Sequence, residues 1–129
     1  MRIHHIGYAV KNIDEAFKFF KILGFEKVNE KVVDEERNVK ILFVKNNEYL
    51  VELIEPYGNN SPIENILKNS GSTPYHICYE SKDILKDIEM LKSEGFVLIS
   101  ELSAAPAINN QKVCFLYNRK VGIIEILAE

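Results

Sequence analysis

Residues 4–26 read HHIGYAVKNIDEAFKFFKILGFE, and residues 75–97 read YHICYESKDILKDIEMLKSEGFV. Sliding the chain by 71 positions (75 − 4) places one stretch on the other, and eight of the 23 pairs are identical. These pairs are His5/His76, Ile6/Ile77, Tyr8/Tyr79, Lys11/Lys82, Ile13/Ile84, Lys21/Lys92, Gly24/Gly95 and Phe25/Phe96. The match resumes with 40–44 over 112–116 and with 51–53 over 124–126. The chain is therefore a duplicated module.

Both copies predict the same order of elements. A short strand (3–10 and 75–80) precedes a segment whose apolar residues recur with a helical period. Asn12 and Glu15 are the expected capping pair of the first helix, and Gly24 and Gly95 are expected to end the two helices in the left-handed conformation. Three more strands are expected near 26–33, 38–45 and 48–55 in the first copy, and near 97–101, 111–117 and 121–128 in the second.

The segment between the copies has the residues of a helix start. Ser61 is the expected N-cap, Pro62 stands at the first helical position, and Glu64 completes a capping box, so a short helix is expected over about 61–69. We therefore expect an α+β fold in which each copy is a βαβββ module. Residues 1–129 would form one domain, made of module 1–57, a linker helix in 58–74 and module 75–129.

The composition limits the classes of partner. The chain has 129 residues, 47% of them hydrophobic, and 16 basic against 19 acidic residues. No run of Lys or Arg is long enough to follow a phosphate backbone, so nucleic acid is not an expected partner. Apolar runs are too short to span a membrane, and residues 1–5 lack the apolar stretch of a signal peptide, so a cytoplasmic location is expected. Cys78 and Cys114 lack the spacing of a zinc ribbon and are expected to be small buried hydrophobes.

The repeat distinguishes between two neighbouring histidines. Only His5 aligns with His76, so His4 is expected to be a structural residue. In the same way Glu52 aligns with Glu125. Each module thus contributes one histidine from its first strand and one glutamate from its last, 47 residues apart (52 − 5) in one copy and 49 (125 − 76) in the other.

Both of these glutamates lie inside apolar strands. A single glutamate in such a strand could also face solvent at a sheet edge. Glu52 and Glu125, however, each share a strand face with apolar residues two positions away on either side. A buried carboxylate needs a partner, so two carboxylates and two histidines indicate one divalent ion such as Zn²⁺, Ni²⁺, Co²⁺, Mn²⁺ or Fe²⁺. Glu55 and Glu129 are expected to be solvated strand ends.

Three segments resemble one known family. HHIGYAVKNIDEAFKFFKILGF, VELIEPYGNNSPIENILKNSGSTPYHICYE and VGIIEILAE are similar to the vicinal oxygen chelate superfamily of glyoxalases, bleomycin resistance proteins and dioxygenases. Within it they are most similar to methylmalonyl-CoA epimerases and to lactoylglutathione lyase (glyoxalase I)-like proteins. The resemblance implies a curved mixed sheet around a metal cleft, with His5, Glu52, His76 and Glu125 as ligands, and a homodimer.

The resemblance also implies an activity. The epimerases and glyoxalases of the superfamily abstract a proton next to a carbonyl of a small-molecule substrate, so an isomerase or lyase is expected, with Glu125 or Glu52 as the catalytic base. The reaction would be epimerisation of a thioester or isomerisation of a hemithioacetal. The usual Gly-Ala-His-Gly loop of epimerases is replaced here by AAPAINN at 104–110.

Two rival functions share the expected fold. A mononuclear iron dioxygenase needs two histidines and one carboxylate with open positions on the ion, and a fourth candidate ligand argues against it. A metal-free protein that binds a small molecule such as an antibiotic is the second rival, because a fold alone does not fix a function. Such binding proteins typically lack the ligand set found here.

Overall fold

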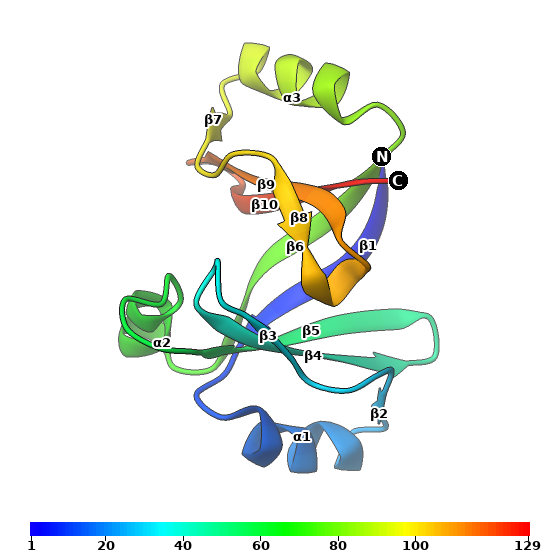
Figure 1. Ribbon diagram of the computed structural model, residues 1–129, viewed down its shortest axis with the longest axis vertical. Helices are drawn as coiled ribbons and strands as arrows, with labels where there is room; N and C mark the ends of the chain where they lie inside the picture. The colour runs from blue at the N-terminus through cyan, green and yellow to red at the C-terminus, as the bar shows by residue number, and fades with distance from the viewer. The chain divides into compact units, whose positions relative to one another are not determined.

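The computed structural model describes residues 1–129, and the chain divides into two compact units. The N-terminal unit comprises His5–Tyr75, and the C-terminal unit comprises Met1–His4 together with His76–Glu129. Each unit combines a mixed β-sheet with helices (Figure 1), so the α+β fold expected from the sequence is confirmed. None of the helices has the length and apolar character needed to cross a bilayer.

The order of elements repeats along the chain (Figure 1). The first copy contains β1 (Arg2–Ala9), α1 (Ile13–Ile22), β2 (Glu26–Lys27), β3 (Val32–Asp34), β4 (Val39–Asn46) and β5 (Tyr49–Pro56). After α2 (Glu64–Ser70), the second copy contains β6 (Thr73–Ser81), α3 (Ile84–Ser93), β7 (Val97–Leu98), β8 (Ser103–Ala105), the 3₁₀ turn η1 (Pro106–Ile108), β9 (Gln111–Asn118) and β10 (Gly122–Ala128). The duplication seen in the sequence is thus a duplication of structure.

The strands of the two units have the same topology. In the N-terminal unit the strand order is β2-β4-β5-β1, and β3 also pairs with β4. In the C-terminal unit the order is β7-β9-β10-β6, and β8 also pairs with β9. The first strand of each copy runs parallel to the last, while the last two strands form an antiparallel hairpin. The first and last strands of a copy are therefore neighbours.

The helix ends follow the expected local chemistry. Asn12 Oδ1 accepts a hydrogen bond from the backbone N–H of Glu15 at 2.9 Å, which confirms the predicted N-cap of α1. Asp83 does the same for Lys86 in α3, at 3.2 Å. Gly24 and Gly95 have φ of 102° and 92°, a region that favours glycine, and they turn the chain back toward the sheet.

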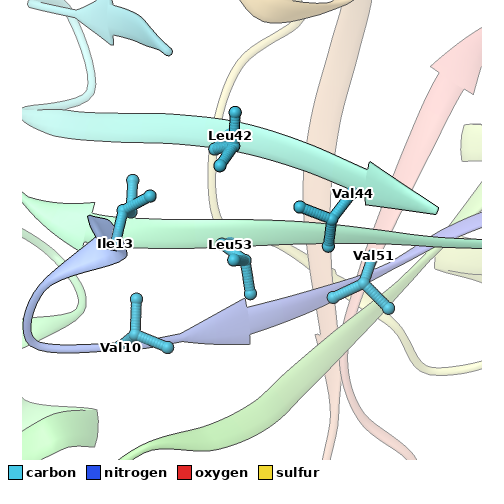
Figure 2. Close-up of a cluster of buried hydrophobic side chains, with 6 residues drawn as sticks. All are labelled: Val10, Ile13, Leu42, Val44, Val51 and Leu53. Atoms are coloured by element: carbon cyan, nitrogen blue, oxygen red, sulfur yellow. The ribbon is translucent and has the colours of Figure 1, made fainter. Parts of the chain in front are cut away.

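Each sheet buries one face against its helix. In the N-terminal unit the core cluster in Figure 2 consists of Val10, Ile13, Leu42, Val44, Val51 and Leu53, against which side chains of α1 pack. In the C-terminal unit the cluster is Ile88, Leu91, Cys114, Leu116, Ile124 and Ile126. Because side chains alternate along a strand, the residues between these core positions point to the opposite face of each sheet.

The strand that follows each helix differs from the prediction. The strand expected over 26–33 is interrupted, leaving β2 and β3, and the strand expected over 97–101 ends at Leu98, with β8 beginning only at Ser103. In the second copy the cause is a bulge, because Ile99 and Ser100 both donate their N–H to Phe115 O, at 2.9 and 3.3 Å. Ser100 Oγ then accepts the N–H of Phe115 at 2.9 Å, which completes the local pairing.

The predicted start of the linker helix is wrong. Helix α2 begins at Glu64, its N-cap position is Ile63, and no side chain caps it. The carbonyl of Ser61 accepts the N–H of Glu64 at 3.2 Å, so residues 61–64 close a turn ahead of the helix. Ser61 Oγ is buried without a hydrogen-bond partner and cannot act as a cap. The capping-box pattern therefore marks a turn here.

The prediction for Glu55 is also wrong. Its Oε1 accepts the backbone N–H of Ile13 at 2.7 Å, and its Oε2 lies 3.7 Å from Lys40 Nζ. Ile13 is the first residue of α1, so a β5 side chain caps this helix in addition to Asn12. Glu129, which was also expected to be a solvated strand end, is exposed.

We predict that Glu55→Ala lowers the free energy of unfolding by about 1–3 kcal/mol, because the buried N–H of Ile13 loses its acceptor. Equilibrium urea unfolding measures the change. Glu129→Ala is the matched control and should change the stability by less than about 0.5 kcal/mol. Equal effects of the two substitutions would contradict the capping role of Glu55.

Candidate metal centre

The N-terminal unit places His5 beside Glu52. Strand β1 runs parallel to β5 with Gly7 opposite Glu52, so the side chain of His5 points to the same face of the sheet. His5 Nε2 lies 3.4 Å from Glu52 Oε1. The two residues are only 1% and 4% exposed, so bulk water does not solvate either side chain. Phe43, opposite Glu52 on β4, meets the His5 ring edge-on with the ring centroids 5.2 Å apart.

The C-terminal unit repeats this arrangement. His76 on β6 and Glu125 on β10 are each 3% exposed, and His76 Nε2 lies 3.1 Å from Glu125 Oε2. Phe115 is opposite Glu125 on β9, and its ring meets the His76 ring edge-on at 5.2 Å. The structure therefore brings each predicted histidine to the predicted glutamate of its own module.

The two phenyl rings were not among the residues singled out from the sequence. The signal was available, because 40–44 aligns with 112–116 and so places Phe43 on Phe115. Each ring lies against an imidazole and supplies apolar surface beside the carboxylate. Charge interactions are stronger where water is excluded, so the rings favour the binding of a cation by these donors.

One cysteine also belongs to this face. Cys78 lies opposite Glu125 in the pairing of β6 with β10, and its thiol donates to Glu125 Oε1 at 3.6 Å. The interpretation of Cys78 as only a small buried hydrophobe is therefore incomplete. Cys114 fits that interpretation, since it lies in the apolar cluster on the other face of the sheet. Burial raises the pKa of the Cys114 thiol to about 11, assisted by the negative charge of Glu125, so this thiol stays protonated near neutral pH.

His4 differs from its neighbour. Its Nε2 lies 3.8 Å from Glu80 Oε1, and Arg2 donates to the other oxygen of the same carboxylate at 2.6 Å. The side chain of His4 is 23% exposed, whereas that of His5 is fully buried. His4 is thus part of a surface ion-pair cluster, in keeping with the structural role expected for it.

The donor atoms suit a divalent metal ion. Each pair offers one imidazole nitrogen and one carboxylate oxygen, and such sets bind borderline ions such as Zn²⁺, Co²⁺ or Ni²⁺. A carboxylate and an imidazole also attract each other when the imidazole is protonated, but burial of that ion pair would be costly without further partners. The residues therefore fit the metal ion that the sequence indicated.

The chain is thus a duplicated α+β protein. Each copy carries a buried His–Glu pair on the sheet face opposite its helix, and these donors could bind a metal ion. Residues 4–115 match the family described as the Glyoxalase/Bleomycin resistance protein/Dioxygenase superfamily. The chain belongs to this superfamily, as its resemblance predicted.

Comparison with individual proteins points to one branch. The chain is 31% identical to the mitochondrial methylmalonyl-CoA epimerase of Dictyostelium discoideum over 130 residues, which cover 99% of this chain and 78% of that protein. It is 32% identical to the corresponding protein of Bos taurus, with coverage of 99% and 73%. A variant of the Streptomyces coelicolor methylmalonyl-CoA epimerase in complex with 2-nitronate-propionyl-CoA has the same fold, with a TM-score of 0.87, 22% identity and coverage of 100% and 97%.

We predict that Co²⁺ or Zn²⁺ stabilises chelator-treated protein, by about 2.7 kcal/mol at a free ion concentration one hundred times the Kd. Differential scanning calorimetry with and without the ion measures the shift in melting temperature. His5→Ala should remove most of the shift because it deletes a buried donor, whereas His4→Ala should preserve it. A shift that survives in His5→Ala and disappears in His4→Ala would show that His4, and not His5, binds the ion.

Proposed function

We propose that the chain is a divalent-metal-dependent isomerase that abstracts a proton next to a carbonyl, with an acyl-CoA thioester of the methylmalonyl type as its substrate. The observation that supports this most strongly is the duplicated, buried His–Glu pair. Membership of the superfamily and the names of the curated relatives support the reaction class and the substrate.

The two pairs together hold one ion in this proposal. Each pair brings an imidazole nitrogen and a carboxylate oxygen together within one unit, at 3.4 Å for His5 and Glu52 and at 3.1 Å for His76 and Glu125. Two carboxylates would balance the charge of a divalent ion, and two imidazoles would complete a four-ligand set.

The chemistry divides between the ion and the side chains. A bound divalent ion supplies Lewis-acid stabilisation of the negative charge that develops on the carbonyl oxygen during proton removal. The carboxylate of Glu125 or Glu52 takes the proton from the α-carbon, and return of a proton to the other face of that carbon inverts its configuration. Phe43 and Phe115 lie edge-on against the two imidazoles and supply apolar surface beside the carboxylates.

Isomerisation of a hemithioacetal, as in lactoylglutathione lyase, is the second candidate function. Glu52 favours it, because the first-module carboxylate position is glutamate in glyoxalase I and often glutamine in epimerases. Both candidates begin with the same proton abstraction, and the names of the curated relatives favour the epimerase. The expected homodimer and the cytoplasmic location stay predictions.

We predict that protein purified without a chelator or a nickel-binding tag contains about one divalent ion per chain, with submicromolar affinity, because the proposed site has four ligands. Elemental mass spectrometry and competition with a chromogenic chelator measure the two quantities. The double variant His5→Ala, His76→Ala should contain none. Two ions per chain, one for each His–Glu pair, would contradict the shared site.

We predict that the metal-loaded protein exchanges the α-proton of methylmalonyl-CoA with deuterium from D₂O, followed by NMR or mass spectrometry. Glu125→Gln should slow this exchange by orders of magnitude, since an amide cannot accept the proton, while its oxygen can still bind the ion. Glu52→Gln is the matched variant and should lose less activity. Exchange by Glu125→Gln at the wild-type rate would transfer the role of base to Glu52.

A further inference from the structure

The two halves of the duplicated face differ beside the carboxylate. Gly7 lies opposite Glu52 in the pairing of β1 with β5, whereas Cys78 lies opposite Glu125 in the pairing of β6 with β10. Gly7 and Cys78 occupy equivalent positions of the repeat. The first half therefore has no side chain at the place where the second half has a thiol.

The thiol gives the two oxygens of Glu125 different neighbours. Cys78 Sγ donates to Oε1 at 3.6 Å, and Oε2 lies 3.1 Å from His76 Nε2. Cys78 is completely buried and Glu125 is 3% exposed, so water does not compete for this hydrogen bond. The terminal torsion of a glutamate has broad, weak preferences, so a neighbouring donor can decide its orientation.

We infer that Cys78 is a positioning residue for Glu125. The thiol holds Oε1 and so leaves Oε2 directed at His76 Nε2, where the donor atoms for the ion lie. This inference rests on the proposed function, because it assigns Cys78 a role in orienting a metal ligand. In metalloproteins, loss of a hydrogen-bond partner of a metal ligand typically lowers metal affinity or activity by about 10–100-fold.

Cys114 is the internal comparison. It is as completely buried as Cys78, and it lies in the apolar cluster with Leu116 and Ile126. A cysteine that acts only as a small hydrophobe tolerates alanine better than serine, because a buried hydroxyl without a partner is costly. A cysteine that acts as a donor tolerates serine better than alanine, because a hydroxyl donates more strongly than a thiol.

The test measures metal affinity in the full-length protein by competition between Co²⁺ and a chromogenic chelator. Cys78→Ala should weaken the affinity by about tenfold or more, and Cys78→Ser should stay within about threefold of wild type. Cys114→Ala and Cys114→Ser should both leave the affinity within about twofold, because neither changes a ligand contact. The visible spectrum of bound Co²⁺ should change in Cys78→Ala and be restored in Cys78→Ser.

An activity measurement supplies the second readout. With a demonstrated substrate, Cys78→Ala should lower kcat by about tenfold with little change in KM, because substrate binding does not depend on the orientation of Glu125. Near-UV circular dichroism of each variant establishes whether it is folded. If Cys78→Ala is not folded, the Co²⁺ affinity of Cys78→Ser relative to wild type is the deciding measurement.

Unchanged Co²⁺ affinity in Cys78→Ala, or weaker affinity in Cys78→Ser than in Cys78→Ala, would overturn the role of Cys78 and leave the proposed function intact. If the wild-type chain bound no divalent ion, the proposed function would be overturned, and the role of Cys78 with it.

Discussion

Placement of an ionisable carboxylate in the interior of each sheet is the constraint on which the rest of the structure depends. Glu52 and Glu125 are almost completely buried, and a buried carboxylate is costly unless a partner compensates it. The parallel pairing of first and last strands provides that partner by placing a histidine on the same face. The helix packs on the other face, where the apolar core clusters lie.

Much of this arrangement could be predicted from the sequence because it depends on local periodicity and on the repeat. Strand parity placed Glu52 and Glu125 with apolar residues, and the repeat separated His5 from His4. The contacts of Glu55 with Ile13 and of Cys78 with Glu125 could not be predicted in this way. Each joins residues more than 40 positions apart, 42 in one case and 47 in the other; the first depends on how the start of α1 packs against β5, and the second on the register between β6 and β10. No local pattern determines either arrangement.

Two short segments outside the regular elements also differ from the prediction. Ser61, Pro62 and Glu64 satisfy the pattern of a capping box, yet the serine side chain is directed into the interior and its carbonyl closes a turn. The bulge at Ile99 and Ser100 similarly interrupts a segment whose composition suits a strand. In both cases a choice between two backbone hydrogen-bond patterns was decided by packing, which the amino-acid pattern alone does not contain.

The division of β1 between the units has a consequence for how the chain can be rearranged. Arg2 and His4 belong to the C-terminal unit, where both contact Glu80, although they precede the first module in sequence. A cut between the two copies would therefore separate residues 1–4 from the unit to which they belong. The repeat unit of the sequence and the compact unit of the structure are not the same segment, so a C-terminal half expressed alone would lack residues 1–4, whereas a circular permutant that joins Glu129 to Met1 and opens the chain between Tyr75 and His76 would keep the residues of each unit contiguous.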